Sequence, residues 1–214
     1  IGSLGYGLGS VNRMMDDLEI TSEPGKTVIE TYKFTKEELH SLPEFPLDFG
    51  AATRRHPKMN VNGDAYVFKK WNNFLLAAVI DGLGHGQFAH KASQSAKNYI
   101  ENHYSLPLNN MLLGVSRACR ATRGVVLSVV RIDTENEKME FSGIGNIETR
   151  IIDKENQKKL VVKRGIIGAK TISPRVEEIP WSNSKMLIMY SDGISSRWNL
   201  NDANIPESAG ASSI

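Results

Sequence analysis

The apolar run from Phe74 to Ile80 constrains the fold of this chain more than any other feature of its sequence. Seven consecutive apolar residues are too few for a membrane span, which needs roughly 20. They suit a strand that is buried on both faces. Two amphipathic segments, Gln87 to Tyr104 and Leu108 to Thr122, then predict a pair of helices. The residues expected on their core-facing stripes are Phe88, Ala92, Ala96, Tyr99 and Ile100 in the first, and Leu108, Met111, Leu112, Val115 and Cys119 in the second.

Strand patterns stand on both sides of the helix pair. Before it, besides the apolar run, they cover Phe49–Ala52 and Ala65–Trp71. After it, they cover Val125–Ile132, Lys138–Ser142, Glu148–Ile152, Lys159–Val162, Val176–Ile179 and Met186–Tyr190. Polar stretches that begin at Asp133 and Asp153 read as hairpin turns. This order predicts an α+β protein with antiparallel sheets rather than a doubly wound parallel sheet.

Charge and cysteine content exclude several functional classes. The 26 Lys and Arg residues nearly balance 24 Asp and Glu, for a formal charge of +2. We therefore expect neither nucleic acid nor a membrane surface as a partner held by bulk electrostatics. Cys119 is the single cysteine, which favours a reducing, cytoplasmic location. The chain starts at Ile1 without a signal segment, so we expect it to be cut from a longer polypeptide.

The amino-terminal residues 1–34 differ from the rest of the chain in composition and in sequence pattern. A glycine-rich opening is followed by helical spacing from Val11 to Leu18, and then by two β-prone stretches around the turn Glu23–Lys26. Residues 35–48 are polar, contain two prolines and lack periodicity, so they read as a linker. The sequence therefore predicts a small unit at 1–34, a linker at 35–48 and a main domain at 49–214.

Three acidic-glycine segments carry the candidate chemistry. They are Asn62-Gly63-Asp64, the run from Asp81 to Gly86, and Ser191-Asp192-Gly193, each at the beginning or the end of a predicted strand. Asp-Gly pairs are common in turns, so a purely structural role is the competing interpretation. Three such carboxylates brought together would instead form an oxygen-rich site for Mg²⁺ or Mn²⁺, unlike the thiolate or histidine cage of Zn²⁺.

Four ordered motifs resemble those of the metal-dependent serine/threonine protein phosphatases, and most closely the bacterial SpoIIE/RsbX-like branch. They begin at Val61, Val79, Phe141 and Met189 and read VNGDAY, VIDGLGHG, FSGIGN and MYSDGI. The resemblance runs from about Phe49 to Trp198. It implies a sandwich of two antiparallel β-sheets flanked by helices, and hydrolysis of phosphoserine or phosphothreonine by a metal-activated water.

The resemblance also implies a ligand set. Asp81 would bridge two Mn²⁺ or Mg²⁺ ions, the Gly82 carbonyl oxygen would bind one of them, and Asp64 and Asp192 would complete the set. Family members carry a further aspartate before a last strand, and the sequence after Asp192 has no evident match. We therefore expect the fold to be truncated at its C terminus.

Other polar residues have two interpretations each. His85 is a candidate catalytic proton shuttle or a helix cap. Arg54 and Arg55 are candidates for binding the substrate phosphate or a solvated basic pair. Asn146 is expected to shape a turn. The remaining histidines, His40, His56, His90 and His103, are expected on the surface or on a helix face.

The amino-terminal segment has a resemblance of its own. Its glycine loop, with Gly5, Gly7 and Gly9, the helical stretch and the Glu-Pro-Gly-Lys turn resemble the carboxy-terminal part of a GHKL-type, RsbT-like ATP-binding domain. Such a loop would hold ATP phosphates at a helix amino terminus. Since the earlier nucleotide-binding motifs of that fold are absent, the segment is expected to be a remnant.

These observations predict an enzyme, a metal-dependent phosphatase that acts on a phosphorylated bacterial signalling protein such as an anti-sigma antagonist or a STAS-type stress protein. Two other classes stay open. One is a phosphatase-like domain that binds and regulates a partner without turnover. The other is part of an ATP-dependent anti-sigma-type serine kinase.

Overall fold

The computed structural model describes residues 17–23, 26–33, 45–153, 156–169 and 172–194. The chain divides into two compact units, Ile1–Phe45 and Pro46–Ile214. No helix in these ranges is long and apolar enough to cross a membrane.

The first unit contains a β-hairpin. Strands β1 (Asp17–Glu23) and β2 (Lys26–Tyr32) pair antiparallel, with Asp17 opposite Tyr32 and Glu23 opposite Lys26. The predicted hairpin is confirmed by this pairing. The expected helix is wrong at its end, because Leu18 belongs to β1. The hydrogen bonds that pair β1 with β2 along its full length outweigh the weak helical spacing of the sequence. Gly5, Gly7, Gly9 and His40 lie outside the described residues.

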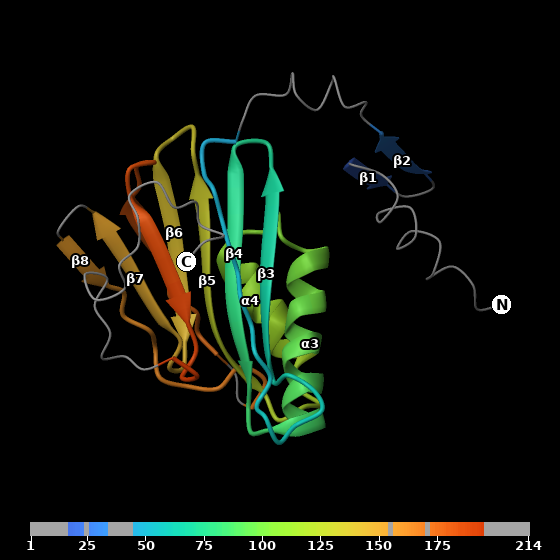
Figure 1. Cartoon of the computed structure of the whole chain (residues 1–214). Helices are drawn as coiled ribbons and strands as arrows, with labels where there is room; N and C mark the ends of the chain where they lie inside the picture. The colour runs from blue at the N-terminus through green and yellow to red at the C-terminus, as the bar shows by residue number, and fades with distance from the viewer. Residues whose placement is uncertain (1–16, 24–25, 34–44, 154–155, 170–171, 195–214) are drawn as a thin grey trace. The chain divides into compact units, whose positions relative to one another are not determined.

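A five-stranded antiparallel sheet is the centre of the second unit (Figure 1). Its order is β3-β4-β5-β6-β9, and the strands are β3 (Asp64–Trp71), β4 (Phe74–Gly82), β5 (Val125–Asp133), β6 (Lys138–Ile144) and β9 (Glu177–Pro180). The apolar run forms β4, between β3 and β5, and Leu75 to Ala78 are all buried. The predicted two-sided burial of this run is confirmed.

A second antiparallel sheet has the order β10-β7-β8, with β7 (Glu148–Asp153), β8 (Asn156–Lys159) and β10 (Met186–Tyr190). It packs beside the first sheet, since Ser128 Oγ of β5 donates to the Ile147 carbonyl oxygen at 3.5 Å. The predicted α+β architecture with two antiparallel sheets is therefore confirmed. The strand predicted over Lys159–Val162 is misplaced, because the hairpin register pairs Asp153 with Asn156 and β8 ends at Lys159.

Two helices cover the five-stranded sheet (Figure 1). They are α3 (Gly86–Asn102) and α4 (Leu108–Ala118), and their apolar faces join β3, β4 and β5 in one buried core. Most stripe residues are buried as predicted, including Ala92, Ala96 and Ile100. Phe88 is an exception, with 62% of its surface exposed. It belongs to the first turn of α3, ahead of the stretch of that helix that packs in the core.

Residues 49–52 do not form the expected strand. No ladder hydrogen bonds in the described part of the chain involve them, and the segment runs as irregular chain toward β3. Phe49 instead stacks on Phe68 of β3, with ring centroids 4.3 Å apart. Aromatic packing, without backbone pairing, therefore accounts for the apolar pattern at this point.

Candidate functional site

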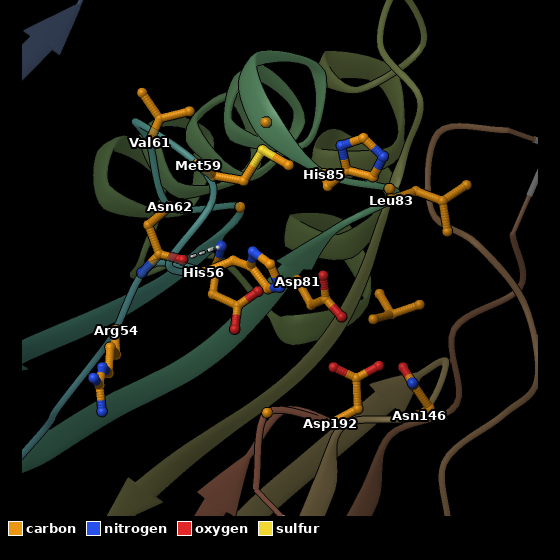
Figure 2. A pocket seen from close by; sticks show the side chains of 16 residues that line it. Arg54, His56, Met59, Val61, Asn62, Asp81, Leu83, His85, Asn146 and Asp192 are labelled. Carbon is orange, nitrogen blue, oxygen red and sulfur yellow. Dashed lines mark hydrogen bonds between the residues drawn. The ribbon is translucent and has the colours of Figure 1, made fainter.

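A cleft of about 430 Å³ brings the three acidic-glycine segments together (Figure 2). Residues that line it from these segments are Asn62, Gly63, Asp64, Asp81, Leu83, Gly84, His85, Gly86, Asp192 and Gly193. They come from positions as far apart in sequence as 62 and 193. Turn chemistry alone gives no reason for such a convergence, so these segments form a candidate active site.

The ladder between β3 and β4 sets two of the carboxylates side by side. Asp64 begins β3 and is the register partner of Asp81 near the end of β4. Beyond them, the Gly82 N–H donates to the Gly63 carbonyl oxygen at 3.2 Å. Directly opposed residues have Cβ atoms roughly 5 Å apart, so the two carboxylates must share one space.

The third carboxylate arrives from the other sheet. Asp192 follows β10, and Figure 2 shows its carboxylate facing the same space as that of Asp81. The preceding residue fixes this approach, because Ser191 Oγ donates to Asp64 Oδ2 at 2.7 Å. That bond joins residues 127 positions apart and connects the two sheets at the cleft.

The carboxyl group of Asp81 has a strongly raised pKa. Burial, together with the neighbouring carboxylates of Asp64 and Asp192, raises the pKa of Asp81 from 3.8 to about 7. A hydrogen bond with Asp64 acts in the same direction. Carboxylates crowded in this way disfavour the ionised state, and a divalent cation would relieve the repulsion.

The donor set fits a hard divalent cation in an open site. Within the described ranges, no group of three or more His, Cys, Asp or Glu side chains lies close enough together to hold a metal ion by itself. The three carboxylates are nevertheless close enough to interact electrostatically. Mg²⁺ usually keeps several waters and binds through one or two carboxylates, so an open oxygen-rich cleft suits it better than a closed cage.

Asn62 and His90 hold the loop that carries Asp64. The Asp64 N–H donates to Asn62 Oδ1 at 3.1 Å, and the Asn62 side chain also bonds to Thr53. His90 Nδ1 lies 2.8 Å from the Asn62 carbonyl oxygen, so Nδ1 carries the hydrogen. His90 lies on helix α3 as predicted, but its side chain also has a specific partner. Its contact joins positions 28 residues apart and has no local sequence signal.

His85 and Arg54 line the cleft, whereas Arg55 does not. His85 is the N-cap residue of α3, but its side chain makes no capping hydrogen bond. Figure 2 shows the Arg54 guanidinium turned away from Asp81 and Asp192. Arg55 Nη1 donates to the Met59 carbonyl oxygen at 2.6 Å, which holds it within its own loop.

The Gly82 position requires glycine. A Cβ there would lie 2.0 Å from the Ala89 carbonyl oxygen of α3, so the helix packs directly on the backbone at the end of β4. The close approach keeps the Asp81–Gly82 segment against α3.

Two further residues line the cleft that were not among the predicted site residues. His56 is exposed, as expected, and Asn146 was expected only to shape a turn; both line the cleft. Figure 2 shows Asn146 beside Asp192. His56 precedes β3 in irregular chain, so no periodicity could assign it to the cleft.

Comparisons with known proteins indicate the family to which the chain belongs. The profile of the family described as Stage II sporulation protein E (SpoIIE) matches residues 73–209. The chain is also 22% identical over 136 residues to phosphoserine phosphatase RsbX of Bacillus subtilis (strain 168), which covers 63% of this chain and 68% of RsbX.

Solved structures share the fold. A chain from the structure described as "The bacterial stressosome: a modular system that has been adapted to control secondary messenger signaling" superposes with a TM-score of 0.72 at 24% identity, covering 78% of this chain and 87% of that one. The structure of RsbX in complex with magnesium superposes with a TM-score of 0.64 at 21% identity, covering 67% and 73%.

Proposed function

The chain belongs to the SpoIIE family, and from that premise we propose that it is a metal-dependent protein phosphatase that hydrolyses phosphoserine or phosphothreonine in a bacterial regulatory protein. The observation that carries this proposal is the convergence of Asp64, Asp81 and Asp192 in one cleft. The phosphatase activity in the name of RsbX and the magnesium in its structure support it.

Different residues of the chain have different roles in the proposed reaction. Asp64, Asp81 and Asp192 would hold two Mg²⁺ or Mn²⁺ ions, with the Gly82 carbonyl oxygen as a further ligand. When bound, such ions lower the pKa of a water molecule and neutralise the phosphoryl oxygens. Ser191 and the Asn62 loop keep Asp64 oriented toward Asp81.

His85 and Arg54 are placed to act on the substrate. His85 lines the cleft with its ring uncommitted to the helix cap, so it is the group that would donate a proton to the departing seryl or threonyl oxygen. Arg54 lines the edge of the cleft and would bind the incoming phosphate after a side-chain rotation. Arg55 has no such role in this proposal, since it bonds to Met59.

The substrate protein is part of the proposal. The relatives named above include a chain of the stressosome and RsbX, so we propose a phosphorylated stress-signalling protein, such as an anti-sigma antagonist or a STAS domain. The ATP-site resemblance around Gly5, Gly7 and Gly9 and the cytoplasmic location stay predictions.

Phosphate release from a phosphoserine peptide tests the proposed function. We expect release with Mg²⁺ or Mn²⁺, loss of release in excess chelator, and loss in Asp192→Asn. Asp153→Asn, which removes a carboxylate outside the cleft at the end of β7, is the matched control and should retain activity. Metal-dependent peptide binding without any release would favour a non-catalytic regulatory domain instead.

A further inference from the structure

Two large apolar side chains and an arginine stand exposed beside the cleft. Phe88, in the first turn of α3, is 62% exposed and Leu83 is 40% exposed. The Arg123 guanidinium lies 4.5 Å from the centroid of the Phe88 ring. Single exposed apolar residues are ordinary, but an aromatic ring paired with arginine is typical of residues that anchor a protein interface.

Arg123 lies against the turn that borders the cleft. A Cβ at Gly84 would lie 2.7 Å from Arg123 Nη1, and the Leu83 N–H donates to the Gly124 carbonyl oxygen at 3.0 Å. Figure 2 shows Leu83 and His85 of this turn close together at the cleft. The Arg123 side chain is therefore next to the cleft without lining it.

A second segment with positive charge is bonded to the backbone next to residues that line the cleft. Lys163 and Arg164 are exposed. The backbone places them there, because the Gly145 N–H donates to the Lys163 carbonyl oxygen at 2.8 Å and Ile167 bridges to Val125. The residues that follow Gly145 and Val125 are Asn146 and Val126, and both line the cleft.

Acidic residues are absent from both segments that carry these charges. The sequence has no Asp or Glu between Glu101 and Asp133, and none from position 156 to 176. Among the described residues, no ion pair involves Arg123, Lys163 or Arg164, and the Lys163 ammonium group donates to the Ser173 carbonyl oxygen at 3.0 Å. We call Leu83, Phe88, Arg123, Lys163 and Arg164 the basic rim.

We propose that the basic rim binds acidic side chains of the phosphoprotein substrate that flank its phosphorylated residue. The inference rests on the proposed function and deepens it. The formal charge of the chain is only +2, too even a balance to hold a continuous polyanion such as a nucleic acid or an anionic lipid surface by bulk electrostatics. The acidic side chains of such a peptide would pair with the basic side chains of the rim, and its apolar side chains would contact Phe88 and Leu83.

Peptide binding to the full chain in Mg²⁺ tests the inference. The probes are two fluorescein-labelled phosphoserine peptides of equal length, one with Glu and Asp flanks and one with Gln and Asn in their place. Arg123→Gln should raise the Kd of the acidic peptide about fivefold, as expected for one partly solvated charge pair, and leave the neutral peptide unchanged. Phe88→Ala should weaken binding of both peptides.

Lys97→Gln is the matched control, since it removes the same charge from a partly exposed side chain of α3 that is nine residues beyond Phe88 and does not line the cleft. It should alter neither Kd, and hydrolysis of a small aryl phosphate should be equal in the wild type, Arg123→Gln and Lys97→Gln. Equal effects of Arg123→Gln on both peptides, or no effect, would overturn the basic rim. So would a larger loss of binding to a single-stranded oligonucleotide than to the acidic peptide.

Failure of the proposed function gives a different result. A wild-type chain that hydrolyses neither the aryl phosphate nor either peptide would contradict the phosphatase activity. The binding comparison would still decide whether the rim discriminates acidic from neutral flanks.

Discussion

Asp81 is the residue on which the electrostatics of the cleft depend. Its folded-state pKa of about 7 lies above the ordinary value of 3.8, because of burial and of Asp64 and Asp192. The ionised carboxylate is thus less favourable in the folded state than in the unfolded chain. Without bound cations, the contribution of this group to stability falls as the pH rises from about 4 to about 7, and is lowest above that range.

Replacing Asp81 should therefore stabilise the cation-free protein while it removes function. In excess chelator at pH 8, Asp81→Asn should raise the free energy of unfolding by about 1 kcal/mol, a value reduced for the partial exposure of this side chain. Urea unfolding measures it, with Asp153→Asn as the control that should change little. A loss of stability in Asp81→Asn under these conditions would contradict the predicted crowding of charge.

Ser191 orients a carboxylate rather than touching the substrate. Its hydroxyl donates to Asp64 Oδ2 at 2.7 Å, so Ser191→Ala should weaken Mg²⁺ binding about tenfold, as is usual when a partner of a metal ligand is lost. Ser191→Thr keeps the hydroxyl and should restore most of the affinity. Calorimetric titration with Mg²⁺ compares the three proteins, and equal affinities would show that the hydrogen bond has no role in positioning Asp64.

Helix α3 positions the cleft as well as covering the sheet. Its His90 bonds to the Asn62 carbonyl oxygen, and its backbone at Ala89 packs on Gly82. Both acidic-glycine segments from β3 and β4 are therefore held by one turn of this helix. A helix that was predicted only as a core element thus supports the candidate active site.

His90→Ala should lower Mg²⁺ affinity by about tenfold, because the Asn62 loop loses its contact with α3. His103→Ala is a matched control: His103 follows the same helix, and its Nδ1 lies 2.8 Å from the Tyr99 carbonyl oxygen, away from the cleft residues. Thermal melting with increasing Mg²⁺ reports both affinities. If His103→Ala reduced the Mg²⁺-induced rise in melting temperature as much as His90→Ala, general weakening of the helix would explain the effect.

The sequence predicted the elements well where burial is periodic. Strand β4 and the buried stripes of α3 and α4 follow directly from hydrophobic spacing. Residues 49–52 were misassigned, because aromatic stacking on Phe68 imitates a strand pattern without backbone pairing. Phe88 matched the helical period but lies ahead of the buried part of α3, where spacing alone cannot define the edge of the core.

The candidate site was predictable only in its acidic residues. Asp64, Asp81 and Asp192 stand next to glycines at strand ends, which a reader of the sequence can find. His90, Ser191 and Asn62 act through hydrogen bonds that depend on how distant segments meet. No local sequence pattern predicts these long-range contacts, so the roles of these residues can be identified only from the folded structure.

Across the whole second unit, a charged network in the smaller sheet reaches the cleft. Glu148 of β7 accepts hydrogen bonds from Lys159, Arg150 and Tyr190, and Tyr190 directly precedes Ser191 and Asp192. Burial acts to raise the pKa of Glu148, but the bonds from Lys159, Arg150 and Tyr190 outweigh it and lower the pKa to about 2. The ionised carboxylate is therefore favoured by the fold.

A lowered pKa stabilises the protein above the unfolded value of 4.5, and this contribution is lost as the pH falls from 4.5 to about 2. Glu148→Gln should lower the melting temperature at pH 7, and the difference from the wild type should shrink below pH 4.5. A pH series of melting curves measures this dependence. A difference that stayed constant down to pH 3 would show that the charge of Glu148 is not what stabilises the sheet.

Binding of Mn²⁺ tests most directly whether the three carboxylates form one cation site, because electron paramagnetic resonance distinguishes bound from free Mn²⁺. We predict saturable binding to the wild type and to Asp153→Asn, weaker binding to Asp64→Asn and Asp192→Asn, and no tight binding to Asp81→Asn. Undiminished Mn²⁺ binding by Asp81→Asn would show that the three carboxylates do not form one cation site.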